Sequence, residues 1–108
     1  QGLSFNYVSR KNEAQVELYI DRGKQRNEEN KKIFEELFIN KESIETVFGN
    51  SLDWERLEGK RACRIRKCIK IGGYNDDEKK WPQIHEALVD AMIRLEKGFK
   101  PYVSKLNI

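Results

Sequence analysis

The stretch Ala14-Gln15-Val16-Glu17-Leu18-Tyr19-Ile20-Asp21 decides the fold of this chain. Its aliphatic side chains occupy every second position and alternate with polar residues or tyrosine. A period of two is typical of a β-strand that buries one face and exposes the other to solvent. Leu3, Phe5 and Tyr7 alternate in the same way, and the polar residues 10–13 suit a hairpin loop between the two segments. The chain is therefore expected to begin with an antiparallel hairpin.

A helical period follows this hairpin over residues 28–48. Apolar side chains recur there at steps of three, four or seven on one helical face, namely at Ile33, Phe34, Leu37, Phe38, Ile44, Val47 and Phe48. Gly49 stands where a left-handed residue commonly ends a helix. The spacing favours one long helix over 28–48, although Asn40 is suited to capping a second segment and leaves a break there open.

The second half of the chain repeats this order. Leu52 and Trp54 lie two positions apart, and the next expected strand carries its apolar residues at odd positions, namely Cys63, Ile65, Ile69 and Ile71. A second helix enters at Trp81-Pro82 and is expected to end or kink at Gly98 or Pro101. Its apolar stripe consists of Ile84, Leu88, Ala91, Met92, Leu95 and Phe99. We therefore predict an α+β fold of order ββαββα, with an antiparallel four-stranded sheet and two long helices over one of its faces.

Length and composition bound the class of protein. The chain has 108 residues and a mass of 12.8 kDa, which fits a single domain over residues 1–108. Its 21 basic and 18 acidic side chains leave a net charge of only +3, which excludes a histone-like polycation. No apolar run reaches the roughly 18 residues of a membrane span. Two cysteines are too few for a disulfide scaffold and favour a reduced, cytoplasmic location. Because the first residue is Gln1, the chain is expected to be an excised or processed piece of a longer protein.

The segment Lys60–Lys70 is the strongest candidate for binding nucleic acid, because it holds six basic side chains and no acidic one. Guanidinium groups in a row along one strand face can engage successive phosphates, and a tyrosine on the neighbouring strand can stack on a base. The candidate contacts are Tyr19, Arg61, Arg64, Arg66 and Lys70. The alternative is that these cations pair across the sheet with acids on neighbouring strands, namely Glu17, Asp21 and Glu55.

Candidates for catalysis are weaker. Asp53, Glu58 and Lys60 match the carboxylates and lysine of a metal-dependent nuclease. However, the glycine within Glu58-Gly59-Lys60 favours a tight turn at this segment. Cys63 and Cys68 point to opposite faces of a strand and cannot chelate one ion. The only histidine, His85, is expected at the surface of a charged helix. The sequence therefore predicts no catalytic residue, metal or cofactor for this domain, with the nuclease as the least favoured reading.

Two further features have a structural interpretation. Gly72-Gly73-Tyr74 lies between a strand and a helix but lacks the full glycine fingerprint of a phosphate-binding loop, so we expect a turn. Trp54 and Trp81 are in register with the apolar stripes, and both are predicted to pack in the core.

An ordered set of short strings spans the chain from about Phe5 to Tyr102. The strings are Glu17-Leu18-Tyr19-Ile20-Asp21, Ile44-Glu45, Phe48-Gly49, Leu52-Asp53-Trp54-Glu55-Arg56-Leu57, Arg61-Ala62-Cys63-Arg64-Ile65, Gly72-Gly73-Tyr74, Trp81-Pro82 and Asp90-Ala91-Met92-Ile93-Arg94-Leu95. Together they resemble an uncharacterised C-terminal domain of bacterial and archaeal proteins, a domain of unknown function. In that family the domain often follows an N-terminal restriction-nuclease-like domain, which carries the nuclease residues.

The resemblance implies a setting rather than a catalytic residue. It suggests a non-catalytic accessory domain of a nuclease- or restriction-associated protein, which either contacts DNA through its basic strand or positions the N-terminal nuclease-like domain. The alternative is a protein–protein or dimerisation module, in which a homodimer or another partner uses the exposed sheet face or an edge strand.

Overall fold

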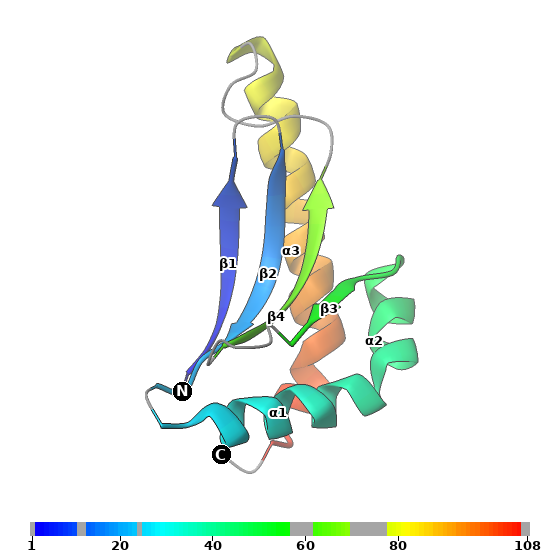
Figure 1. Cartoon of the computed structure of the whole chain (residues 1–108). Coiled ribbons are helices and arrows are strands. Elements are labelled where there is room, and N and C mark those ends of the chain that lie inside the picture. The colour runs from blue at the N-terminus through cyan, green and yellow to red at the C-terminus, as the bar shows by residue number, and fades with distance from the viewer. Residues whose placement is uncertain (1, 11–12, 24, 57–61, 70–77, 107–108) are drawn as a thin grey trace.

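The computed structural model of the chain describes residues 2–10, 13–23, 25–56, 62–69 and 78–106. Four strands form one antiparallel sheet in the order β1-β2-β4-β3, so that β2 and β4 are central (Figure 1). Their bounds are β1 Leu3–Ser9, β2 Ala14–Ile20, β3 Asp53–Glu55 and β4 Cys63–Ile69. The predicted α+β class and the antiparallel four-stranded sheet are confirmed.

The helices differ from the prediction in number. The expected long helix over 28–48 is two helices, α1 Asn27–Ile39 and α2 Lys41–Phe48. Asn40 separates them with φ −101° and ψ 19°, and its side-chain nitrogen donates a hydrogen bond to the Glu36 carbonyl oxygen at 3.2 Å. Asparagine competes in this way with the regular helical bonds, so the prediction of one helix is wrong and the alternative of a break at Asn40 is confirmed.

The last helix, α3 Trp81–Val103, follows a short 3-10 turn at Glu78–Lys80 and runs along one face of the sheet (Figure 1). It continues through Gly98 and Pro101, so the expectation that it ends at these residues is wrong, whereas the alternative of a kink there stays a prediction. Gly98 serves a tertiary contact, since a Cβ there would lie 3.1 Å from the Ile44 carbonyl oxygen of α2. Pro101 lies near the end of the helix, where its ring removes only one backbone hydrogen bond.

The core lies between α3, α1 and the sheet face that they cover. Val16, Leu18 and Ile65 have no exposed surface, as their alternation predicts. Phe99 of α3 is also fully buried, and its ring centroid lies 6.5 Å from that of Phe5 and 5.8 Å from that of Trp54. This aromatic contact joins α3 to both edge strands of the sheet. None of the helices in the described part of the chain has the length and apolar character needed to cross a bilayer.

Candidate functional site

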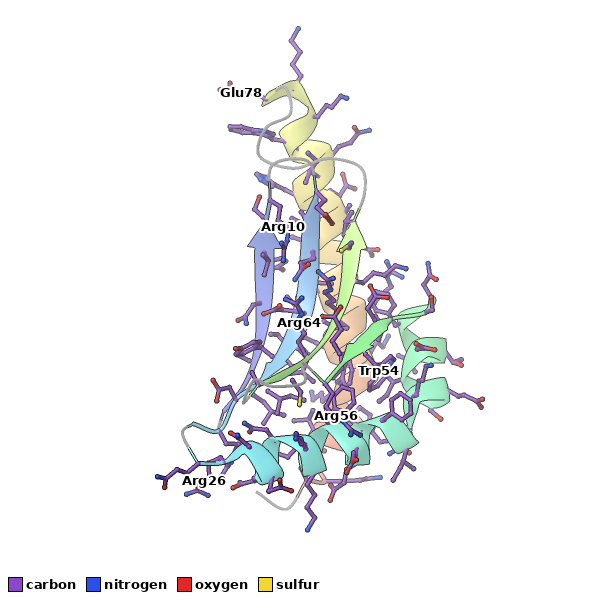
Figure 2. All side chains as sticks on the ribbon, in the orientation of Figure 1. Arg10, Arg26, Trp54, Arg56, Arg64 and Glu78 are labelled. Carbon is purple, nitrogen blue, oxygen red and sulfur yellow. The ribbon has the colours of Figure 1, made fainter. Side chains whose placement is uncertain are left out.

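The sheet face opposite the helices brings together three of the predicted contact residues. Alternate positions of the four strands form two cross-strand rows, Ser4-Tyr19-Arg64-Glu55 and Asn6-Glu17-Arg66-Asp53. We call these eight residues the polar sheet face. Arg64 lies on this face towards the viewer in Figure 2, with α3 passing behind the sheet. The prediction that Tyr19, Arg64 and Arg66 share one face is confirmed in geometry, whereas Arg61 and Lys70 lie outside the described residues.

Both arginines of the polar sheet face have partners within the domain. The Arg64 Nε donates to the Glu55 carboxylate, and the Arg66 Nε donates to its second oxygen at 3.1 Å. Arg66 also donates from Nη1 to Oε1 of Gln15 at 2.8 Å. Burial alone would raise the pKa of Glu55, but the hydrogen bonds and charges of Arg64 and Arg66 outweigh it and hold that pKa below its ordinary value. Glu55 thus links the two arginines into one charged network across β3 and β4.

The other two acids considered as partners for these arginines have different roles. Glu17 accepts hydrogen bonds from Asn6 at 3.0 Å and from Gln15 at 3.2 Å. Asp21 accepts from the backbone N–H of Gly23 at 2.9 Å and shapes the turn after β2. The two rows of the polar sheet face hold three carboxylates, at Glu17, Asp53 and Glu55, against two guanidinium groups. In its described part, therefore, this face is not a basic patch.

The candidate catalytic residues are placed only in part. Asp53 begins β3, whereas Glu58 and Lys60 of the proposed nuclease triplet and the Gly72-Gly73-Tyr74 segment lie outside the described residues. Cys63 and Cys68 are thiols on opposite faces of β4, as predicted, and burial raises the pKa of the Cys68 thiol. Within the ranges that the structure describes, no group of three His, Cys, Asp or Glu side chains is placed to hold a metal ion.

The outer edge of β1 is a candidate interface that the sequence predicted only as an unspecified edge strand. Two backbone bonds fix which residues face β2, since the Arg10 N–H donates to the Glu13 carbonyl at 2.8 Å and the Asp21 N–H donates to the Gly2 carbonyl at 2.7 Å. Hydrogen-bonded pairs alternate along an antiparallel ladder, so the even-numbered residues of β1 bond to β2. The odd-numbered residues therefore direct their N–H and C=O groups outward, away from β2, and no described strand pairs with them.

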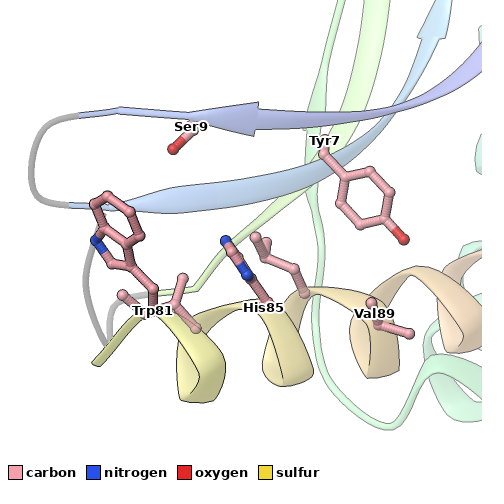
Figure 3. Close-up of a pocket in the computed structure, with 7 residues that line it drawn as sticks. Tyr7, Ser9, Trp81, His85 and Val89 are labelled. Atoms are coloured by element: carbon pink, nitrogen blue, oxygen red, sulfur yellow. The ribbon is translucent and has the colours of Figure 1, made fainter. Parts of the chain in front are cut away.

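An apolar groove of about 450 Å³ lies between β1 and the first half of α3. Figure 3 shows Trp81 and His85 rising from α3 towards the strands and Tyr7 extending from β1 towards α3. Tyr7 exposes 53% of its surface and Val89 exposes 50%. We define the β1–α3 groove by its lining residues Tyr7, Ser9, Trp81, Ile84, His85, Leu88 and Val89.

The two tryptophans have different environments. Trp54 is half-buried and packs edge-on against Phe34 with ring centroids 6.1 Å apart, so its predicted place in the core is confirmed. Trp81 is 37% exposed and lines the β1–α3 groove, so its predicted place in the core is wrong. His85 is exposed, as predicted, but it lies in the wall of the same groove.

The two edges of the sheet are built differently. β3 is three residues long and two of them, Asp53 and Glu55, are acidic, which discourages pairing with another strand. β1 is seven residues long, with the sequence LSFNYVS, and contains neither a charge nor a proline. In a chain with 36% charged residues, that uncharged segment is the sequence signal that could have identified the open edge.

Comparison with known proteins gives one match. A family model described as a domain of unknown function (DUF4268) matches residues 1–103. No curated protein and no solved structure matches the chain. The description of the family names no activity, partner or ligand.

Proposed function

This chain belongs to a family of domains of unknown function (DUF4268), and we propose that it is a non-catalytic interaction domain that docks a protein strand along the edge of β1. The observation that carries this proposal is the juxtaposition of an uncharged seven-residue edge strand with the apolar β1–α3 groove. Strand addition supplies affinity through backbone hydrogen bonds and specificity through pockets for alternate side chains. The open edge of β1 offers the backbone hydrogen-bonding groups, and the β1–α3 groove offers the pocket for side chains.

The register of β1 suits this mode of binding. Residues directly opposite each other in an antiparallel pair have side chains on the same face of the sheet. A strand that bonds to the outward N–H and C=O groups of Phe5, Tyr7 and Ser9 therefore directs every second side chain towards α3. Those side chains would enter the β1–α3 groove, and the intervening ones would extend the polar sheet face. The proposed ligand is accordingly an extended segment in which apolar and polar residues alternate.

Binding of such segments can be measured with Trp81 as the reporter. In a Trp54→Phe background Trp81 is the only tryptophan of the chain. We expect its fluorescence to change saturably with heptapeptides in which Val, Leu or Phe alternates with Thr or Lys. Val89→Glu is expected to weaken binding about tenfold or more, because burying an unpaired carboxylate costs more than the roughly 1.4 kcal/mol that a factor of ten represents.

Two variants keep this experiment specific to the groove. Ile39→Glu introduces the same charge at a side chain that is 82% exposed on α1, and Arg64→Ala removes a cation from the opposite sheet face. Both are expected to bind the peptides as the parent does. The proposal is wrong if the monomeric chain binds no alternating heptapeptide, or if Val89→Glu binds as tightly as Ile39→Glu.

A second candidate function is contact with nucleic acid through the polar sheet face. It is favoured by the position of Tyr19 directly beside Arg64, on a face that no described helix covers. An aromatic ring next to a guanidinium group is the arrangement with which open sheets stack bases and neutralise phosphates. In opposition, the Glu55 carboxylate already occupies both Arg64 and Arg66.

This competition makes the second candidate testable by a fluorescence titration of short duplex and single-stranded DNA at two salt concentrations. If the arginines contact phosphate, the wild-type domain binds more weakly at high salt and Arg64→Ala/Arg66→Ala loses binding. Glu55→Gln then binds more tightly than wild type, because it removes the competing carboxylate from both guanidinium groups. This function is eliminated if the wild type, Arg64→Ala/Arg66→Ala and Glu55→Gln are all folded and none of them binds DNA at low salt.

The proposal also includes the setting that the sequence resemblance implies. We place the domain in the cytoplasm of a bacterium or archaeon, as an accessory unit of a nuclease- or restriction-associated protein with an N-terminal nuclease-like domain. A docking domain without catalytic residues fits that setting, because it can hold the catalytic unit next to another chain.

A further inference from the structure

We infer that the strand docked at β1 is supplied by a second copy of this chain, so that two sheets join through their β1 strands around a two-fold axis. This inference rests on the proposed function, since it names the partner in the same strand addition. Two antiparallel sheets of four strands would then form one continuous sheet, with both α3 helices on the same face.

The first observation behind this inference is the contrast between the two sheet edges. Proteins commonly protect an edge strand with charge, proline, a bulge or short length, because unpaired backbone groups invite another strand. β3 has two of these protections, namely its three-residue length and its acidic residues. β1 has seven residues, no charge and no proline, and pairs with β2 in an unbroken one-to-one register. An edge of this kind is suited to pairing.

The second observation is an exposed stripe on α3. Trp81, His85, Val89 and Ile93 follow one another at intervals of four, the spacing of one slanting helical face. Trp81 is 37%, Val89 50% and Ile93 59% exposed. At a helical rise of about 1.5 Å per residue the stripe is roughly 18 Å long, close to the roughly 20 Å between the first and last residues of β1. The exposed stripe and the open strand therefore have matching lengths.

A second copy accounts for both features, whereas a single peptide strand accounts for one. A peptide paired with β1 would cover the β1–α3 groove, but Ile93 does not line that groove. A partner that brings its own helix below its own edge strand can also cover the stripe. Because the stripe carries no lysine, arginine or acid, two copies of it can meet without like-charge repulsion.

Two-fold symmetry satisfies both contacts at once. In an isologous dimer the same surface of each subunit faces its counterpart, and two copies of one strand related by this axis are antiparallel. An axis perpendicular to the sheet beside β1 also places the two α3 helices on the same side of the joined sheet. The outward-bonding residues Phe5 and Tyr7 of one copy then carry their side chains towards the helix layer of the joined sheet.

Solution mass is the primary test. Light scattering and sedimentation over a range of concentrations are expected to give twice the 12.8 kDa mass of the single chain. Asn6→Lys places two ammonium groups close to the axis while Glu17, 3.0 Å from the Asn6 amide, remains as a partner within each copy. This variant and Val89→Glu are both expected to be monomeric, whereas Ile39→Glu on the exposed surface of α1 remains dimeric. Circular dichroism confirms that each variant is folded.

Disulfide trapping locates the contact. In a Cys68→Ser background, single substitutions Asn6→Cys and Tyr7→Cys sample two positions near the middle of β1, where the axis lies when most of the strand is paired. Directly opposed strand residues have Cα atoms about 4.5–5.5 Å apart, which suits a disulfide. We expect one or both to cross-link rapidly on mild oxidation. The matched control is Asp53→Cys on β3, at the other edge of the sheet, which is expected to form no disulfide between copies.

The outcomes separate this inference from the proposed function. A wild-type chain that stays monomeric up to its solubility limit overturns the second copy, as does a dimer that survives both Asn6→Lys and Val89→Glu. If the monomer still binds alternating heptapeptides at Trp81, strand addition stands and only the identity of the partner is wrong. If it neither dimerises nor binds these peptides, both proposals fail.

Discussion

Phe99→Ala is expected to lower the free energy of unfolding by about 3–5 kcal/mol, the typical loss when a buried phenylalanine is truncated. The Phe99 ring has no exposed surface and contacts both Phe5 of β1 and Trp54 of β3. Its removal opens a cavity at the point where α3 is joined to both sheet edges. Since a small domain has only about 5–15 kcal/mol of stability in total, this variant is expected to lose a large fraction of its stability.

Urea denaturation followed by circular dichroism measures this loss, with Phe38→Ala as the matched control. Phe38 belongs to the same residue type but is 46% exposed, and it stacks on Phe34 at 6.1 Å. Truncation there removes two aromatic pairs, with Phe34 and with Trp54, each worth about 0.5–1.5 kcal/mol, and opens no enclosed cavity. Equal destabilisation by the two variants would show that Phe99 is not the centre of the core.

Glu55→Gln is expected to lower the free energy of unfolding by about 1–3 kcal/mol at neutral pH, because it removes a carboxylate that accepts charged hydrogen bonds from Arg64 and Arg66. The wild-type contribution depends on pH. The folded-state pKa of Glu55 is lowered from 4.5, so the unfolded chain binds the proton more readily than the folded one. The stabilisation is therefore fully present above about pH 4.5 and is lost as the pH falls through the lower, folded value.

Denaturation curves at pH 7 and pH 3 test both parts of this prediction. The difference between wild type and Glu55→Gln is expected to be large at pH 7 and to shrink at pH 3. Glu35→Gln provides the control, because Glu35 pairs with Arg56 at 2.7 Å but is 58% exposed, and such pairs contribute about 0–1 kcal/mol. A Glu55→Gln effect that is no greater than the Glu35→Gln effect would mean that the network across β3 and β4 does not stabilise the sheet.

Much of the fold could be predicted because burial on one sheet face imposes a period of two on the sequence. The alternation of residues 14–20 and the odd-numbered apolar residues of β4 identified two strands and their buried side, although not their central place in the sheet. The break at Asn40 was less accessible, because the apolar period of the helix continues on both sides of it. The prediction that the last helix ends at Gly98 was wrong because a local preference was overridden by a tertiary contact. Glycine commonly ends helices, but here it allows α2 and α3 to approach, and that contact involves residues far apart in the chain.

The candidate site was predictable only where strand parity determines it. Parity places Tyr19, Arg64 and Arg66 on one face, but their partners depend on the register of the short strand β3, which no local pattern specifies. Trp81 shows a similar limit. It shares the helical spacing of buried residues such as Ile84. Only the position of β1 over α3 determines that Trp81 is exposed whereas Ile84 is buried, with 4% of its surface exposed.

Pairing β2 with β4 costs the folding chain more conformational entropy than the other strand pairings, because it joins the two segments that lie farthest apart in the sequence. Only the four residues 10–13 separate β1 from β2 in the chain, whereas Leu18 of β2 pairs with Ile65 of β4, and the whole of α1, α2 and β3 lies between these two strands in the chain. Closing a long segment costs entropy before any of its contacts can compensate, and folding slows as such distant contacts come to dominate. The sheet is thus joined from two local halves at its centre, and that junction sets the order in which its parts can assemble.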